Sequence, residues 1–219
     1  GIFTAGIGAA AWKGVAINTN GSIPSATRIT QASTFFQIPP TGNGGYSSGL
    51  YRANQKIELL STGTTNNTSA IAFDFYMNFT GTNAGLLSFD WASINNSTGN
   101  RSSSLKVYAT VDGTNYTEIT AAQVLNFTNG VPSAGSIINV QLPTMFNNAA
   151  NACLRFYYYN GTGGSTGSRP RLSLDNIKVT AVPTTPCVTP TAQPTNFTLG
   201  SVTHNARQPR TALPAPNPR

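Results

Sequence analysis

Alternation of apolar and polar side chains is the feature that most restricts how this chain can fold. In the stretch 86–94, the apolar residues Leu87, Phe89 and Trp91 occupy every second position, and Asp90 is one of the polar residues between them. Successive side chains of a β-strand point to opposite faces of its sheet, so this spacing predicts a strand with one buried face. Trp91 shares its parity with Leu87 and Phe89 and is therefore expected in the core.

The same alternation recurs in three further stretches, at 71–79, 105–111 and 154–159. A sheet with one apolar face has to bury that face against another layer. No stretch of the chain shows convincing helical periodicity, so the second layer is expected to be a second sheet. The sequence therefore predicts an all-β fold, a two-sheet antiparallel β-sandwich.

Shorter alternating segments predict additional strands, at 27–38, 51–60, 116–119 and 137–142. Asp112-Gly113 stands between two alternating segments, and this pair predicts a hairpin turn in which both residues have positive φ. In the stretch 171–181 the apolar residues change from even to odd positions. A β-bulge near Asp175 and Asn176 would absorb the extra residue.

The composition divides the chain into three parts. Residues 1–182 carry the alternating segments and are predicted to form one β-sandwich domain, large enough to bury a single core. Residues 183–195 are rich in Pro and Thr, which is typical of an extended linker. Residues 196–219 contain little periodicity and few core residues. We expect them to pack poorly or to form a disordered tail.

The surface is expected to carry little charge. Only 9% of the residues are charged, against ~25% in an average soluble protein, and polarity comes mainly from Asn, Thr, Ser and Gly. The formal net charge of +7 is spread along the chain without a basic run, so nucleic acid is not an expected partner. No apolar run reaches the ~18 residues of a membrane span, so we expect no membrane insertion. This composition predicts an extracellular or cell-surface location.

Two cysteines are present, Cys153 and Cys187, too few for a disulfide scaffold or a thiolate zinc site. In an oxidising compartment they allow one disulfide between a core strand and the segment that leaves the sandwich. The alternative is two unrelated thiols, with Cys153 acting as a small buried hydrophobe. Both interpretations stay open at this point.

Residues that commonly carry catalysis are scarce, since the chain has six Asp and Glu residues and one His. His204 lies in the C-terminal segment, so no Ser-His-Asp or Cys-His arrangement is expected within the sandwich. Asp74 and Asp90 would face the same way on neighbouring strands, as a glycosidase pair requires. A general acid also needs a raised pKa and a cleft, which no sequence pattern indicates here. We therefore predict that the chain is not an enzyme.

Charged and tyrosine side chains gather at the outward parity of the strands, which also includes Lys56, Glu58 and Asp74. If these strands share a sheet, its outer face presents tyrosine rings beside charged hydrogen-bonding groups, a combination that suits a sugar. The alternative is a solvated sheet whose opposite charges pair across strands at ~0.2 to 1 kcal/mol each. The residues predicted to bind a ligand are Tyr76, Asp90, Lys106, Tyr108, Arg155, Tyr157, Tyr159 and Arg171.

Four segments resemble a known family, at 87–92, 104–119, 154–157 and 169–180. Their sequences LSFDWA, SLKVYATVDGTNYTEI, LRFY and RPRLSLDNIKVT are similar to jelly-roll β-sandwich modules of large secreted and surface proteins of the Bacteroidota. The resemblance implies an architecture like that of carbohydrate-binding modules and a parent protein exported by type IX secretion. The segment 190–199 resembles the entry to a fibronectin type III domain, which implies that 196–219 is a truncated stub of that domain.

The same resemblance bears on cofactors. Modules of this type often hold a structural calcium ion through carboxylate and backbone oxygens, and Asp175 is the best ligand candidate. The alternative is a carboxylate that accepts hydrogen bonds from backbone amides at the bulge. The family supplies no catalytic motif, and no other cofactor is expected.

These observations predict a non-catalytic adhesion or glycan-binding module of a larger secreted or cell-surface protein. Its expected partners are a glycan or cell-surface ligand, and the secretion machinery acting on the full-length precursor. One alternative is a structural spacer or a surface-filament subunit that associates with itself through exposed edge strands. A second alternative is an accessory domain of a secreted hydrolase.

Overall fold

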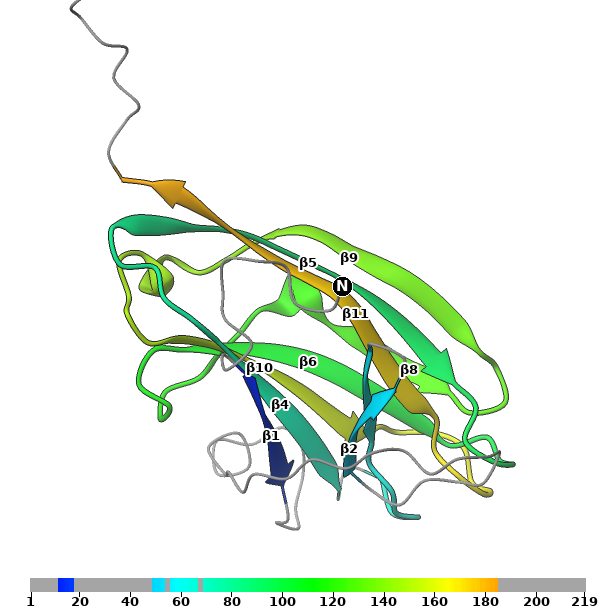
Figure 1. Cartoon of the computed structure of the whole chain (residues 1–219). Helices are drawn as coiled ribbons and strands as arrows, with labels where there is room; N and C mark the ends of the chain where they lie inside the picture. Colours follow the sequence, from blue (N-terminus) through cyan, green and yellow to red (C-terminus); the bar gives the residue numbers. More distant parts are fainter. Residues whose placement is uncertain (1–11, 18–48, 54–55, 67–68, 185–219) are drawn as a thin grey trace, which may run out of the picture. The chain divides into compact units, whose positions relative to one another are not determined.

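The computed structural model describes residues 12–17, 49–53, 56–66 and 69–184 (Figure 1). In chain order its elements are β1 (Trp12–Ile17), β2 (Gly49–Ala53), β3 (Lys56–Leu60), β4 (Ala70–Met77), β5 (Thr82–Ile94), β6 (Ser102–Thr110), β7 (Thr117–Glu118), the 3-10 turn η1 (Thr120–Ala122), β8 (Val124–Thr128), β9 (Ser133–Gln141), the 3-10 turn η2 (Thr144–Phe146), β10 (Ala152–Asn160) and β11 (Arg171–Pro183). The described part of the chain contains no helix long and apolar enough to cross a membrane.

All described residues belong to one compact unit, residues 1–184. Apart from Pro183 and Thr184, the linker predicted at 183–195 lies outside the described residues. The stub predicted at 196–219 and the strand predicted at 27–38 also lie outside them.

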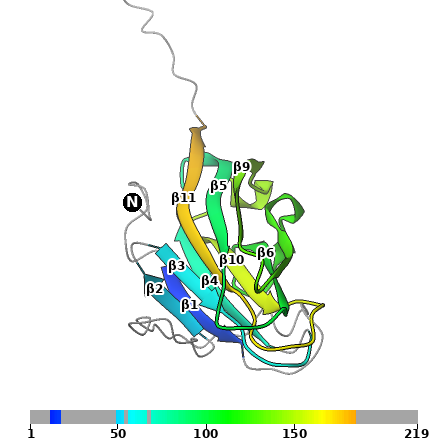
Figure 2. The same cartoon turned by 90° about the vertical axis from the view of Figure 1, so that its right-hand side faces the viewer.

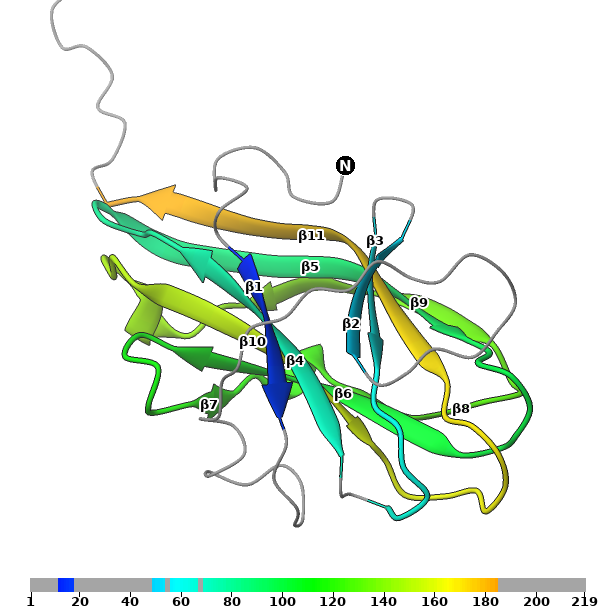
Figure 3. The same cartoon turned by 60° about the horizontal axis from the view of Figure 1, so that its bottom comes forward.

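The strands form two antiparallel sheets that lie face to face (Figures 2 and 3). Sheet I has the order β1-β4-β10-β6, and both β7 and β8 pair with β6. Sheet II has the order β2-β3-β11-β5-β9. Strands β3 to β6 and β9 to β11 alternate between the two sheets along the chain, which is the connectivity of a jelly roll. The predicted all-β, two-sheet antiparallel sandwich is confirmed.

The core lies between the sheets and is built from the predicted inward positions. Phe73 on β4 and Phe156 on β10 stack with their ring centroids 4.6 Å apart, and Phe89 on β5 meets Phe156 edge to face at 5.3 Å. Leu87 and Phe89 are buried, while Trp91 is partly buried and packs against the same cluster. Aromatic contacts of this kind add ~0.5 to 1.5 kcal/mol per pair beyond burial of area.

The strand predicted at 51–60 is in fact two strands, and this prediction was wrong. β2 and β3 pair antiparallel, with Ala53 opposite Lys56. In the sequence, the consecutive polar residues Asn54 and Gln55 interrupt the alternation at this point. The hairpin places Lys56 at the start of β3, where its side chain is exposed.

β8 was not predicted. Its buried residues Val124 and Phe127 are three positions apart, so they do not follow a period of two. Asn126 between them has a positive φ of 54°, and the register against β6 shifts along this strand. A bulge therefore hides the strand from a search for alternation.

The loop between β6 and β7 differs from the predicted two-residue turn. β6 ends at Thr110 and β7 begins at Thr117, so the loop spans 111–116. Gly113 has a positive φ of 70°, whereas Asp112 does not. The Asp112 carboxylate instead accepts hydrogen bonds from the backbone amides of Thr114 and Asn115, at 2.8 and 2.7 Å. The turn is thus an Asx-type turn held by a side chain.

The predicted bulge on β11 is confirmed. The register against β5 shifts between Asp175 and Lys178, and Asn176 adopts a positive φ of 49°. Asp175 lies directly opposite Asp90 of β5. The bulge therefore turns Asn176 onto the face of sheet II that carries both carboxylates.

Arg169 joins the loops at one end of the sandwich. It is 2% exposed and lies just before β11. All five N–H groups of the Arg169 guanidinium have acceptors, and four of the five acceptors are backbone carbonyls. The acceptors of Arg169 are the carbonyls of Gly63, Thr65, Ser102 and Gly161 and the side-chain oxygen of Asn66.

Candidate functional site

The predicted ligand residues lie on two opposite outer faces of the sandwich rather than on one. Six lie on strands of sheet I and two on strands of sheet II, because parity shows the direction of a side chain but not the sheet of its strand. The outer face of sheet I carries Tyr76, Lys106, Tyr108, Arg155, Tyr157 and Tyr159, and that of sheet II carries Asp90 and Arg171.

Three of the predicted tyrosines do not form an open platform. Tyr157 is 0% exposed and Tyr108 is 3% exposed, and both pack with Tyr159 in a second hydrophobic cluster outside the main core. Burial raises the pKa of the Tyr108 hydroxyl, and the nearby Glu118 carboxylate raises it further. These three rings are buried against one another, so none of them offers an open face on which a sugar can stack.

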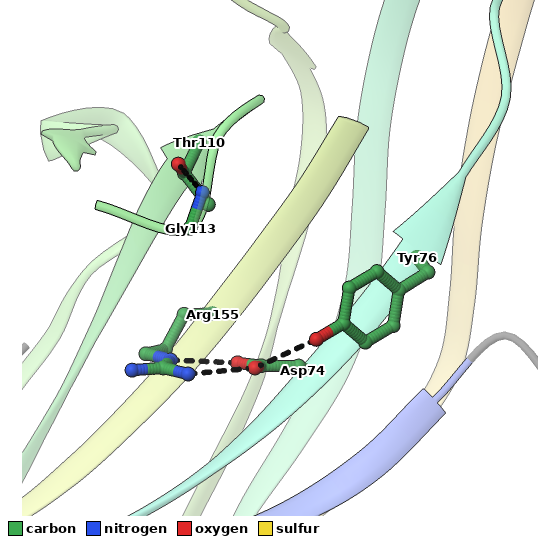
Figure 4. A network of polar contacts seen from close by, with 5 residues as sticks. All are labelled: Asp74, Tyr76, Thr110, Gly113 and Arg155. Atoms are coloured by element: carbon green, nitrogen blue, oxygen red, sulfur yellow. Dashed lines mark hydrogen bonds and ion pairs between the residues drawn. The ribbon is translucent and has the colours of Figure 1, made fainter. Parts of the chain in front are cut away.

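The centre of this face is a buried ion pair. Arg155 on β10 donates from Nε to Asp74 Oδ1 and from Nη2 to Asp74 Oδ2, both at 2.7 Å. Figure 4 shows the Arg155 fork facing the Asp74 carboxylate, with the ring of Tyr76 on the other side. The Tyr76 hydroxyl donates to Asp74 Oδ2 at 3.4 Å. The Arg155 guanidinium thus binds a carboxylate of the protein itself, at a position that was predicted to bind a ligand.

Lys106 on β6 is also paired. Its ammonium donates to Glu118 Oε2 on β7 at 3.0 Å. Arg171 on β11 makes the equivalent contact on the opposite face, where Nη1 donates to Glu58 Oε2 at 2.8 Å. At these positions the structure shows the opposite-charge pairs of the solvated-sheet interpretation.

A polar groove crosses the outer face of sheet II. Its volume is about 510 Å³, and four strands, β3, β11, β5 and β9, contribute to it. Such a volume lies within the ~300 to 1,000 Å³ range of ligand pockets. The lining residues are Lys56, Asp90, Trp91, Ala92, Ala134, Gly135, Ser136, Ser173, Asp175 and Asn176.

Asp90 is the best-positioned polar group in this groove. Its Oδ1 accepts a hydrogen bond from the Ser136 hydroxyl at 2.5 Å, and its Oδ2 accepts one from Asn176 Nδ2 at 2.7 Å. These two donors, together with the charge of Lys56, hold the pKa of the Asp90 carboxyl below its usual value. Asp90 is therefore an ionised acceptor whose orientation is fixed from both sides.

Asp175 and Lys56 complete the charged part of the groove. Lys56 Nζ lies 3.9 Å from Asp175 Oδ2, and Asp175 Oδ1 accepts the backbone N–H of Asn176 at 2.8 Å. The groove therefore holds two carboxylates and one ammonium group, a net charge of −1.

The calcium ion predicted at Asp175 stays a prediction. Calcium takes six to eight oxygen ligands, whereas an ammonium group faces Asp175 here. Among the described residues no group of three or more His, Cys, Asp or Glu residues gathers. The hydrogen bond to the amide of Asn176 corresponds to the alternative interpretation of this carboxylate.

Trp91 serves the core and also borders the groove. A Cβ atom at Gly135, the partner of Trp91 on β9, would lie 3.0 Å from the indole Nε1. A larger residue at position 135 would therefore force the ring to shift by a few tenths of an ångström. The indole also contacts the ring of Phe127, whose centroid lies 6.4 Å away, so the Trp91 side chain belongs to the core.

Asp74 and Asp90 cannot act as a glycosidase pair. They point away from each other, on the outer faces of sheets I and II. In addition, Asp74 is held in the ion pair with Arg155, and the lowered pKa of Asp90 is the opposite of what a general acid needs.

The predicted disulfide stays a prediction. Cys153 is buried on β10, and Cys187 lies outside the described residues.

Sequence reasoning missed three groove residues, Ser136, Ser173 and Asn176. The predicted bulge is a signal for Asn176, since an extra residue at that point changes which side chains face outward. Ser136 lies on β9, one residue before the strand that was predicted at 137–142. No pattern distinguishes it from the many other serines of the chain.

No protein-family model matches the chain, and no curated protein matches it. Its backbone is similar to two cleaved adhesin domains of Lys-gingipain from Porphyromonas gingivalis. One is 14% identical with a TM-score of 0.42, and the other is 17% identical with a TM-score of 0.38; each alignment covers 82% of this chain and 95% of that domain. The family 11 carbohydrate-binding module of a Clostridium thermocellum cellulosomal cellulase is 14% identical with a TM-score of 0.32, over 61% of this chain and 79% of that module. Similarity at this level does not identify a ligand.

Proposed function

We propose that this chain is a non-catalytic glycan-binding module of a larger extracellular protein and that the groove on sheet II is its binding site. The observation that carries the proposal is the arrangement around Asp90. An ionised carboxylate is fixed by Ser136 and Asn176 in an open groove, and further hydrogen-bonding groups lie on the neighbouring strands. A sugar hydroxyl donates well to such a carboxylate because the acceptor is already oriented.

The other groove residues suit the remaining hydroxyls of a sugar. Asp175 adds a second carboxylate acceptor, and Lys56 adds an ammonium donor that is partly exposed. Ala92 and Ala134 are small, so they leave the groove open between the polar side chains. The net negative charge favours neutral glycans over sulfated or carboxylated ones, because like charges oppose binding.

Binding to a glycan array tests this proposal. Native chain, Asp90→Asn and Ser136→Ala are compared with the control Ser133→Ala, which removes a hydroxyl on the same strand outside the groove. We expect binding to neutral glycans by the native chain and by Ser133→Ala. Loss of the Asp90 charge is expected to weaken binding about tenfold or more, since a hydrogen bond to a charged group contributes ~1.5 to 3 kcal/mol. Equal binding by all four proteins would show that the groove is not the glycan-binding site.

The extracellular setting is part of the same proposal. It is supported by the low content of charged residues, 9%, and by the dominance of Asn, Thr and Ser among the polar ones. Export by the type IX route, a fibronectin type III stub and a role beside a hydrolase domain stay predictions from the sequence resemblance.

A second candidate function is self-association through β9. This strand has one partner among the described strands, β5, and it carries Ile138 with 68% of its surface exposed. An edge strand of this kind can pair with a second copy. The positive φ of Asn139, 55°, and the register shift beside Ile137 distort the edge, which makes such pairing less favourable. A mass that rises with concentration in light scattering, and that falls for Ile138→Lys, would support this function.

A further inference from the structure

A second pocket lies on the opposite side of the sandwich, on the outer face of sheet I. Its volume is about 370 Å³, and it lies where β4, β6 and β10 meet the loop 111–116. Two tyrosines, an amide, a carboxylate and a few small groups line it. The residues are Tyr76, Thr110, Val111, Asp112, Gly113, Tyr116, Asn151 and Cys153.

Both tyrosines of this pocket are anchored to the same ion pair. The Tyr76 hydroxyl donates to Asp74, and the guanidinium of Arg155 lies 4.9 Å from the centroid of the Tyr116 ring. The Arg155 charge is balanced by the bidentate contact with Asp74 (Figure 4). The two rings are therefore held in place before any ligand arrives, and unlike Tyr157 both are only partly buried.

The loop side of the pocket is fixed as well. The Thr110 hydroxyl accepts the backbone N–H of Gly113 at 2.9 Å (Figure 4). The same hydroxyl donates to Asp112 Oδ1 at 3.1 Å. Asn115 adds donors from its backbone and side chain to the same carboxylate, both at 2.7 Å. These hydrogen bonds hold the pKa of Asp112 well below its usual value, so it is an ionised acceptor at the pocket rim.

We propose that this pocket is a second ligand site, which takes a single pyranose ring of a glycan. Tyrosine rings suit the C–H face of a sugar, the Asp112 carboxylate accepts hydroxyl protons, and the exposed Asn151 amide both donates and accepts. Rigid walls lower the entropy cost of binding. The site is independent of the groove on sheet II, so a chain with both sites can hold two glycan strands on opposite faces.

Saturation-transfer NMR with small probes tests the proposal. The probes are the methyl glycosides of glucose, galactose, mannose and N-acetylglucosamine, and tetramethylammonium chloride as a cation that tyrosine rings also attract. The proteins are the native chain, Asn151→Ala, Tyr116→Leu, the matched control Tyr116→Phe, and the groove variant Asp90→Asn. Asn151 is exposed, so its variant stays informative even if Tyr116→Leu perturbs the loop.

We expect at least one methyl glycoside to receive saturation from the native chain, Asp90→Asn and Tyr116→Phe. Asn151→Ala and Tyr116→Leu are expected to weaken that binding about fivefold or more, the equivalent of ~1 kcal/mol. Absence of transfer to every glycoside, transfer to tetramethylammonium alone, or transfer unchanged in both pocket variants would overturn the proposal. Loss of transfer only in Asp90→Asn would assign the sugar to the groove and leave no second site.

Discussion

Arg155 and Asp74 are register partners on β10 and β4, and the guanidinium contacts both carboxylate oxygens at 2.7 Å. Their side chains are 3% and 1% exposed, so the pair is taken out of water on what was expected to be an open face. The pair also positions Tyr76 and Tyr116. It links the stability of sheet I to the geometry of the second pocket.

Removing one member of this pair should be costly. Asp74→Asn keeps the size of the side chain but leaves the Arg155 charge without its counterion, so we expect a loss of about 3 to 5 kcal/mol in the free energy of unfolding. The double variant Asp74→Leu, Arg155→Met should recover much of that loss. Urea denaturation measures both, and a loss below about 1 kcal/mol for Asp74→Asn would show that the pair is solvated.

Arg169 should be irreplaceable by lysine. Lysine has three donors where the guanidinium uses five, so Arg169→Lys leaves buried carbonyls unsatisfied and should cost about 2 kcal/mol or more. Arg101→Lys is the matched control, because Arg101 is only partly buried and makes three such bonds. Equal thermal stability of the two variants would contradict this account of the end loops.

Phe156 is the residue whose replacement best tests the packing of the core, because it contacts two other core rings. Phe156→Ala removes its contacts with Phe73 and Phe89 from a site that is fully buried and should cost about 3 to 5 kcal/mol. Leu125→Ala on β8, where the side chain is 45% exposed, should change stability by less than about 0.5 kcal/mol. Similar costs for the two variants, measured by denaturation, would argue against the inward assignment.

Alternation predicted the inner face of the sandwich well, because a buried strand face has to be continuous. Leu87, Phe89 and Phe156 all lie in the core as their parity requires. Parity could not assign strands to sheets, so Asp74 and Asp90 were expected on one face and lie on opposite faces. Parity also could not show whether an outward side chain is covered by other residues. Tyr157 points outward and is still buried.

The groove could be predicted only in part for the same reason. Asp90 and Asp175 were both singled out, but their direct opposition depends on the register of β5 and β11, which the sequence does not reveal. Ser136 reaches Asp90 from β9, and the two residues are more than forty positions apart in the chain.

Glycan binding in the groove should be independent of pH between 8 and 5. The pKa of Asp90 is lowered, so the carboxylate stays ionised over this range, and any stability or affinity that it contributes is lost only as pH falls through that lowered value. Calorimetric titrations at pH 8 and pH 5 should give affinities within about twofold, or ~0.4 kcal/mol. A steep loss between pH 7 and 5 would mean that the carboxyl titrates there instead.

The most direct test of the glycan-binding groove is amide chemical-shift mapping. A ¹⁵N-labelled native chain is titrated with the neutral oligosaccharide that binds best on the array. We expect the largest shifts at Lys56, Asp90, Ser136 and Asn176. Shifts confined to the end loops, or to the sheet I face alone, would contradict the assignment of the groove as the glycan site.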